Sequence, residues 1–170
     1  MLVCFVIFLF GGGGVLGKED ILEPVLVSSI STAISLVAFG ATHFLAYSNG
    51  SLYSWGSNTF GELGREFKST EDSMAPSVAK DEVKGITALG AGRNYSAAIV
   101  DGSIMMCGKG AKGVLGSGKT QNLDVFTLIE GTKAAVSIGC GHTHTVAVCE
   151  GGGIVACGSK DHGRLGDAKF

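Results

Sequence analysis

The stretch that decides the fold of this chain reads Trp55-Gly56-Ser57-Asn58-Thr59-Phe60-Gly61-Glu62-Leu63-Gly64, and it recurs. It returns as Cys107–Gly116 and as Cys157–Gly166, and a worn copy runs from Phe10 to Gly17. The closing glycines at 17, 64, 116 and 166 are 47, 52 and 50 residues apart. A period near fifty residues indicates a repeat architecture, in which each unit buries its apolar face against its neighbours.

Two dipeptides ahead of this phrase, Asn49-Gly50 and Asp101-Gly102, predict tight hairpins. Residues of these types accept the positive φ that a two-residue turn needs to match the twist of its flanking strands. Both dipeptides are flanked by runs rich in β-branched and aromatic residues. The third copy carries Glu150–Gly153 at this point, one residue longer, and we expect a β-bulge there.

Further short apolar runs lie upstream of each hairpin, so each unit holds about four short strands, and we find no convincing amphipathic helix. Four strands in roughly fifty residues, repeated, are typical of propeller blades. The predicted fold class is all-β, a partial β-propeller of about three to four four-stranded antiparallel blades. The predicted units are a degenerate partial blade at 1–17, repeats at 18–64, 65–116 and 117–166, and a tail at 167–170.

Three columns of residues recur in phase when the units are aligned on their hairpins. One column is glycine, one is histidine or tyrosine, and one is tryptophan or cysteine. We expect the glycines to allow positive φ and close backbone approach, and the larger side chains to fill the space between blades. The members are Gly40, Gly92 and Gly141; His43, Tyr95 and His144; and Trp55, Cys107 and Cys157.

The pattern Gly-x-x-His, hairpin, Trp-Gly-x-Asn-x-x-Gly-x-Leu-Gly resembles that of the regulator of chromosome condensation repeats, and Gly40–Gly64 matches it closely. The resemblance covers practically the whole chain, including proline-led elements at Pro24 and Pro76. It implies a seven-bladed propeller, whereas this chain holds three full units and a fragment. It also implies a range of functions: nucleotide exchange on a small GTPase, scaffolding in cytoskeletal or ciliary assemblies, and regulation of ubiquitin ligases.

Composition narrows the classes of partner. The formal net charge is −2 and no basic run occurs, so we expect neither nucleic acid nor a membrane as partner. Charged residues make up 16% of the chain against a norm of about 25%, so the surface is either sparingly charged or partly covered by something else. Five cysteines without framework spacing argue against a disulfide-stapled secreted domain. We therefore expect a cytoplasmic protein, with a cytoskeletal or nuclear location as the alternative.

The N-terminus allows two interpretations. Leu2 to Phe10 is a run of nine apolar residues followed by four glycines, which has the length of a signal-peptide core. It lacks a positively charged start and a small-residue cleavage site. Because Phe10-Gly11 aligns with Trp55-Gly56, the repeat register favours a buried strand, and a secretory signal over residues 1–14 is the alternative.

Two glycine motifs imitate nucleotide sites. Gly113–Thr120 fits the phosphate-binding loop formula, but such a loop needs a buried strand before it and a helix after it. Neither 108–112 nor 121–125 has those patterns, and Gly113 to Gly116 already belong to the repeated phrase. Gly108-x-Gly110-x-x-Gly113 matches the dinucleotide fingerprint without the βαβ unit that the fingerprint requires.

A group of thiols and imidazoles near the C-terminus could be taken for a zinc cluster. We favour packing between blades, because some of these residues stand in the structural columns and the earlier units offer no comparable thiols. No Ser/His/Asp set or carboxylate pair stands out. We therefore predict no catalytic, cofactor-binding or metal-binding residue and no cofactor. The group comprises Cys140, His142, His144, Cys149, Cys157 and His162.

These observations predict a non-enzymatic protein–protein interaction or scaffold module that acts in a larger assembly or oligomer. We place its binding surface on the loops after each Leu-Gly, Arg65–Ala75 and Ser117–Asn122, because loops that vary on a repeated scaffold carry recognition. The alternative is a guanine-nucleotide exchange factor or regulator for a small GTPase. Expected partners are proteins: a second copy that completes the ring, a cytoskeletal assembly or a small GTPase. An incomplete ring leaves strand edges open for association, so we expect the arc to be completed by a second copy, by a large assembly or by the rest of a longer reading frame.

Overall fold

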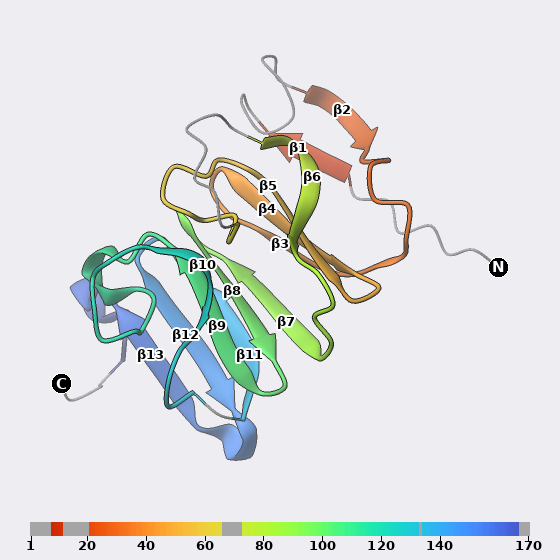
Figure 1. The fold of residues 1–170 in the computed structure, drawn as a ribbon. Helices are drawn as coiled ribbons and strands as arrows, with labels where there is room; N and C mark the ends of the chain where they lie inside the picture. The colour runs from red at the N-terminus through yellow and green to blue at the C-terminus, as the bar shows by residue number, and fades with distance from the viewer. Residues whose placement is uncertain (1–7, 12–20, 66–72, 133, 167–170) are drawn as a thin grey trace.

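The computed structural model describes residues 8–11, 21–65, 73–132 and 134–166. Over these residues the chain forms antiparallel sheets that stand side by side (Figure 1). Their helical content is limited to three short 3₁₀ turns. None of the described helices is long and apolar enough to cross a bilayer.

Two of the sheets have four strands each, in which consecutive strands pair as a meander. The first sheet contains β3 (Ile34–Phe39), β4 (His43–Ser48), β5 (Ser51–Gly56) and β6 (Ser73–Lys80). The second sheet contains β7 (Ile86–Ala91), β8 (Tyr95–Val100), β9 (Ser103–Gly108) and β10 (Leu123–Leu128). In both sheets the outer strand follows the repeated phrase, so each sheet takes its last strand from the next sequence unit.

The remaining sheets have fewer strands. The third sheet contains β11 (Ala135–Cys140), β12 (His144–Cys149) and β13 (Ile154–Gly158), and a small sheet pairs β1 (Phe8–Gly11) with β2 (Ile21–Leu26). The inner strands bring the blades together, since β3 contacts β7 and β7 contacts β11 (Figure 1). The predicted fold class, an all-β partial propeller, is confirmed. Residues 1–7 and 12–17 of the predicted partial blade and signal-like segment, and the tail at 167–170, lie outside the described residues.

The hairpin predictions are confirmed at the first two turns and corrected at the third. Asn49 and Gly50 have φ of 46° and 86°, as the tight turn requires, and Asp101 and Gly102 have 48° and 73°. The third connection is a 3₁₀ turn at Glu150–Gly152, and β12 pairs with β13 without a shift of register. The β-bulge expected there is therefore wrong, because the turn itself accommodates the extra residue.

The repeated phrase forms the same turn in each copy. The amide of its last glycine donates to the carbonyl of the glycine three residues earlier, at 3.0 Å in all three copies. These last glycines, Gly64, Gly116 and Gly166, have φ of 67°, 66° and 71°, where a side chain would be strained. Residues 117–122 then form a loop that leads into β10, and not the helix that a phosphate-binding loop would need.

A buried carbonyl in the phrase joins the first sheet to the second. The carbonyl oxygen of Glu62 accepts hydrogen bonds from Ser96 Oγ at 2.6 Å and from Cys107 Sγ at 3.6 Å. Ser96 Oγ also lies 2.9 Å from Nε2 of His43. Because the serine proton is already donated to Glu62, His43 must donate from Nε2. Burial lowers the pKa of His43, which favours the neutral imidazole with its proton on Nε2.

The same bridge joins the second sheet to the third. The carbonyl oxygen of Val114 accepts from Thr145 Oγ1 at 2.9 Å and from Cys157 Sγ at 3.2 Å. The hydroxyl of Tyr95, which occupies the position of His43, donates to the carbonyl of His144 at 2.6 Å. The expectation that these columns fill the space between blades is confirmed for His43, Tyr95, Cys107 and Cys157.

The glycine column lets neighbouring blades approach closely. A Cβ on Gly92 would lie 2.0 Å from the ring of Tyr95 and 2.7 Å from the carbonyl oxygen of Gly141 in the third sheet. A Cβ on Gly40 would meet His43 at 2.3 Å and the Gly92 carbonyl oxygen at 2.7 Å. The close fit at Gly40 and Gly92 therefore excludes any side chain larger than the hydrogen atom of glycine.

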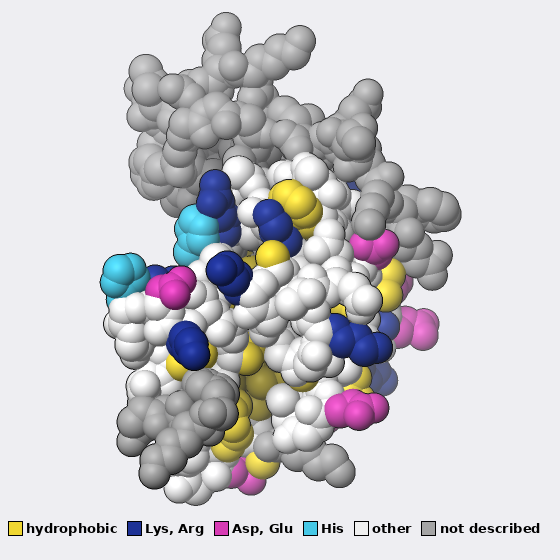
Figure 2. All heavy atoms as spheres, turned by 90° about the vertical axis from the view of Figure 1, so that its left-hand side faces the viewer, with side chains coloured by type: hydrophobic (Ala, Val, Ile, Leu, Met, Phe, Trp, Pro, Cys, Tyr) yellow, Lys and Arg dark blue, Asp and Glu magenta, His cyan; other side chains and the backbone are white. Residues whose placement is uncertain are grey.

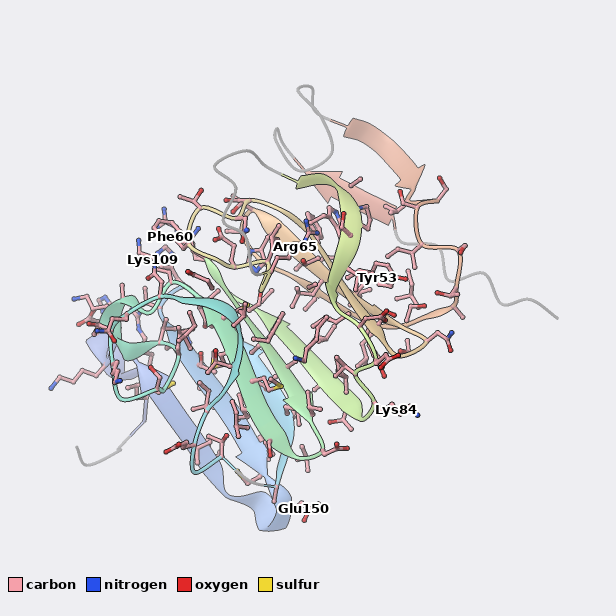
Figure 3. The ribbon with its side chains drawn as sticks, in the orientation of Figure 1. Tyr53, Phe60, Arg65, Lys84, Lys109 and Glu150 are labelled. Atoms are coloured by element: carbon pink, nitrogen blue, oxygen red, sulfur yellow. The ribbon has the colours of Figure 1, made fainter. Side chains whose placement is uncertain are left out.

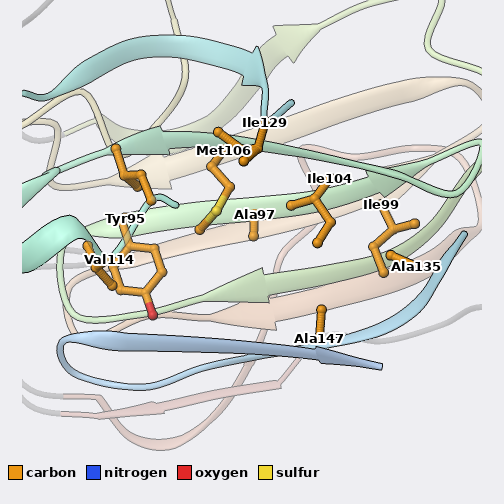
Figure 4. Packing of buried hydrophobic residues seen from close by; sticks show 10 residues of the cluster. Tyr95, Ala97, Ile99, Ile104, Met106, Val114, Ile129, Ala135 and Ala147 are labelled. Carbon is orange, nitrogen blue, oxygen red and sulfur yellow. The ribbon is translucent and has the colours of Figure 1, made fainter. Parts of the chain in front are cut away.

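Apolar side chains fill the rest of each interface. Between the second and third sheets they form one continuous cluster (Figure 4). Most of its members come from the second sheet and the turn that follows it, and the third sheet adds two alanines. Its buried members are Tyr95, Ala97, Ile99, Ile104, Met106, Val114, Leu115, Ile129, Ala135 and Ala147.

The first prediction concerns the glycine column. Gly92→Ala forces the added methyl into the Tyr95 ring and the Gly141 carbonyl, so we expect a loss of about 1–3 kcal/mol in the free energy of unfolding. Gly153→Ala is the matched control, because Gly153 has φ of −64° and no neighbour within 4 Å. Urea denaturation of both variants checks this, and equal stabilities would contradict it.

The second prediction concerns pH. Burial lowers the pKa of His43 from 6.5 to about 4, against a smaller raising effect of the Tyr95 backbone. Between these values the unfolded chain binds a proton that the folded chain does not. The free energy of unfolding should therefore fall by about 3 kcal/mol as the pH is lowered through this window.

His43→Tyr places at this position the residue that the next repeat uses, and it removes the titration. Other acidic and basic groups are shared by the two proteins, so the difference between them isolates His43. We expect the variant to lose less stability than the parent between pH 6.5 and pH 4 in urea denaturation. Parallel losses would show that His43 does not stay neutral in the folded chain.

Candidate binding face

The turns of the repeated phrase lie at one end of the sheets, and positively charged side chains gather there. Figure 2 shows lysine, arginine and histidine side chains close together on this face. Each comes from a turn position at which the repeats differ. The pocket and the contacts of Asp161 described below place six such residues on this face: Arg93, Lys109, Lys112, His142, His162 and Arg164.

A polar pocket of about 170 Å³ opens between the turns of the second and third sheets. Arg93 and His142 follow corresponding glycines of the two repeats, and Arg93 Nη1 donates to His142 Nε2 at 2.7 Å. Because a guanidinium can only donate, Nε2 of His142 accepts and the ring carries its proton on Nδ1. None of the lining residues is acidic; they are Arg93, Asn94, Tyr95, Lys109, Ala111, Val114, His142 and Thr143.

Lys109 belongs to this pocket and also reaches the first sheet. Its ammonium lies 4.3 Å from the centre of the Phe60 ring, at the turn after β5 (Figure 3). This cation–π contact holds the charge at the face without neutralising it. Glu62 lies nearby but is buried, and its carboxylate accepts from Ser57 Oγ at 3.0 Å and from the Phe60 amide at 2.6 Å. Glu62 therefore fixes the turn and is not exposed to a partner.

An ionised carboxylate lies at the edge of the same face. Asp161 Oδ2 accepts from Ser159 Oγ at 2.6 Å, and this bond lowers the pKa of Asp161. The positive charges of Lys112 and Arg164 lower the pKa further. Arg164 Nε also donates to the Asp161 carbonyl at 2.7 Å. Asp161 therefore offsets only part of the positive charge of Lys112 and Arg164 at this edge, so the face is positively charged here as well as at the pocket.

The two loops predicted to bind partners have different settings. All residues of Ser117–Asn122 except Thr120 line a hollow of about 650 Å³ beside β10. The Asn122 side chain accepts a hydrogen bond from the Gly110 amide at 3.2 Å. In the loop Arg65–Ala75, residues 66–72 lie outside the described part of the chain. The Arg65 guanidinium is half-buried and donates to the carbonyl of Ser77 in β6 at 3.2 Å.

The thiols and imidazoles that could be taken for a zinc cluster have separate neighbours. Cys140 packs on Gly90, where a Cβ would lie 2.6 Å from its Sγ, and burial raises the pKa of Cys140 to about 12. His142 bonds Arg93, and the ring of His144 covers Gly141. In the described ranges no group of three His, Cys, Asp or Glu residues is placed to hold a metal ion.

Sequence reasoning missed the positively charged face because it looked for runs of charge. Arg93 and His142 are about fifty residues apart, and Lys109 lies in a third segment. Their common feature is their place between the recurring glycines, at positions where the repeats differ. An alignment of the units shows basic residues at these variable positions, and this is the signal from which the face could have been predicted.

Comparison with known proteins supports the architecture. The family model for the regulator of chromosome condensation (RCC1) repeat matches residues 49–99 and 101–148. In its crystal structure with Kap60, yeast RCC1 (Prp20) superposes with a TM-score of 0.82 at 22% identity. That superposition covers 97% of this chain and 42% of Prp20, and it bears on the fold alone.

Two curated relatives are similar to this chain over part of their own length. The secretion-regulating guanine nucleotide exchange factor of Bos taurus is 33% identical over 120 residues, which is 68% of this chain and 25% of that protein. The X-linked retinitis pigmentosa GTPase regulator homolog of Caenorhabditis elegans is 34% identical over 141 residues, covering 76% of this chain and 10% of that protein. The chain therefore spans a quarter or less of these relatives.

Proposed function

This chain belongs to the RCC1 repeat family, and we propose that it is a non-enzymatic interaction module that binds an acidic segment of a partner protein. The observation that carries the proposal is the pocket between Arg93, Lys109 and His142. The pocket is lined by two permanent cations and a histidine, and it has no acidic lining residue. Carboxylates are the groups that such donors bind best.

The size of the pocket favours a side chain over a small molecule. Pockets for small ligands are typically about 300–1,000 Å³. At about 170 Å³ this pocket suits one side chain of a protein partner, such as aspartate or glutamate. The scaffold supports this use, since the glycine turns and the Lys109–Phe60 contact hold the donors in place before a partner arrives.

The third prediction tests the pocket with a fluorescein-labelled oligoglutamate peptide. Arg93→Ala and Lys109→Ala should each weaken binding about tenfold, as expected for losing a hydrogen bond to a charged group. Lys84→Ala removes the same charge at the opposite end of the sheets (Figure 3), so it should leave affinity nearly unchanged. Fluorescence anisotropy at two salt concentrations gives the affinities, which should fall as salt rises.

Two controls decide whether the pocket recognises acidic protein. An oligoglutamine peptide of the same length should bind far more weakly than oligoglutamate. A DNA duplex serves as a second polyanion, and tighter binding of DNA than of the peptide would overturn the proposal. Equal affinities of the parent, Arg93→Ala and Lys109→Ala proteins would overturn it as well.

A second candidate function is guanine-nucleotide exchange on a small GTPase. It is supported by the similarity to the secretion-regulating exchange factor, which is 33% identical over the matched residues. The other partners expected from the sequence, a second copy that completes the ring and a cytoskeletal assembly, stay predictions. The two functions differ in turnover, because an exchange factor acts catalytically whereas a binding module does not.

The fourth prediction separates these functions. Small GTPases are loaded with fluorescent GDP and mixed with the chain at substoichiometric and at equimolar concentration. For an interaction module we expect no change in the rate of GDP release at either concentration. Accelerated release at substoichiometric concentration would establish exchange activity and replace the first proposal.

A further inference from the structure

The polar pocket between the turns of the second and third sheets is surrounded by three permanent cations. Arg93 and Lys109 line it, and its lining contains no acidic side chain. Arg164 approaches from the third copy of the repeated phrase, because its Nη1 donates to Oγ1 of the lining residue Thr143 at 3.1 Å. The three cations come from three separate segments of the chain, so a group bound between them is approached from more than one side.

Arg164 is held in place by contacts within the chain. Its Nε donates to the carbonyl of Asp161 at 2.7 Å, its Nη1 bonds Thr143, and its side chain is partly buried. The Asp161 carboxylate accepts from Ser159 Oγ at 2.6 Å and carries a single negative charge beside Lys112 and Arg164. It therefore cannot neutralise both cations, and positive charge is left for a ligand at the pocket.

Arg93 and Lys109 are also oriented by contacts within the chain. Arg93 Nη1 donates to Nε2 of His142 at 2.7 Å, and this bond uses one of the five N–H donors that a guanidinium carries. The remaining donors keep the fork geometry that binds carboxylate and phosphate oxygens in pairs. Lys109 is partly buried, and its ammonium is positioned by the Phe60 ring at 4.3 Å. The donors are therefore arranged before a partner binds, which lowers the cost of ordering them.

We propose that this pocket receives a phosphorylated serine or threonine of a partner protein. The inference rests on the proposed function, because it names the acidic group that the same pocket binds. A phosphoserine carries about −1.5 to −2 charges at pH 7 and three acceptor oxygens, whereas a carboxylate carries one charge and two oxygens. The phosphoryl group can thus accept a charge-assisted hydrogen bond from each of the three segments that supply Arg93, Lys109 and Arg164.

The size and charge of the pocket favour a phosphorylated side chain over other phosphates. At about 170 Å³ it is smaller than the roughly 300–1,000 Å³ typical of small-ligand sites, which leaves no room for the base and sugar of a nucleotide. A nucleic-acid phosphodiester carries one charge per phosphate, so it balances the three cations no better than a carboxylate does. The net charge of −2 also provides no long-range attraction for a polyanion.

The fifth prediction compares three fluorescein-labelled peptides that differ at one position. Each is the oligoglutamate peptide of the third prediction, with serine, glutamate or phosphoserine at its centre. We expect the phosphoserine peptide to bind about tenfold more tightly than the glutamate peptide, because it adds charge and at least one charge-assisted hydrogen bond. The serine peptide should bind no more tightly than the glutamate peptide. Fluorescence anisotropy at pH 7.4 and constant salt gives the three affinities.

A substitution of Arg164 separates the two acidic groups. Arg164→Gln removes the third cation, so the preference for phosphoserine over glutamate should fall at least threefold while the affinity for the glutamate peptide changes little. Lys160→Gln is the matched control, because it removes a charge from the same turn and does not line the pocket. It should leave the preference unchanged. A purely structural role of Arg164 would weaken both peptides equally, and the ratio of affinities would then stay constant.

The outcomes distinguish this inference from the proposed function. Equal affinities of the phosphoserine and glutamate peptides would overturn the inference and leave the acidic-segment function standing. Failure of all three peptides to bind would overturn both. A preference for phosphoserine that persists undiminished in Arg93→Ala or in Arg164→Gln would also overturn the inference, since the phosphoryl group would then bind elsewhere on the chain.

Discussion

The structure depends on how closely one blade's backbone can approach the next. At Gly40 and at Gly92 an added Cβ would lie 2.7 Å from a carbonyl oxygen of the following blade. The Ala41 amide donates to one of these carbonyls at 3.2 Å, so the contact is a backbone hydrogen bond as well as a packing limit. Because the same distance recurs at both interfaces, one constraint sets the spacing of the blades throughout the described arc.

That spacing allows the polar bridge between blades. Only at this separation can the carbonyls of Glu62 and Val114 accept from hydroxyls of the next sheet, Ser96 and Thr145. A buried carbonyl without a partner would cost free energy, so the hydroxyl column and the glycine column depend on each other. The pairing also explains why the eighth residue of the phrase can vary between Glu62 and Val114, since its backbone carbonyl makes the bridge.

The proposed binding pocket follows from this rigid frame and from its variable positions. The turns hold Arg93 and Lys109 at one end of the sheets, where residues between the glycines are free to differ.

The sequence by itself determined the fold class, the hairpins at Asn49-Gly50 and Asp101-Gly102, and the columns that pack between blades. These features are local or periodic: positive φ selects particular residues, and a repeated interface repeats its residue types. Only the tertiary structure decided which side chains meet across blades. Arg93 and His142, or Lys109 and Phe60, are distant in sequence, and their contacts depend on the rotation from one blade to the next. The absence of a bulge at the third hairpin could not be predicted from the sequence either. A 3₁₀ turn and a bulge both accommodate an extra residue, and only the strand register of the folded chain distinguishes them.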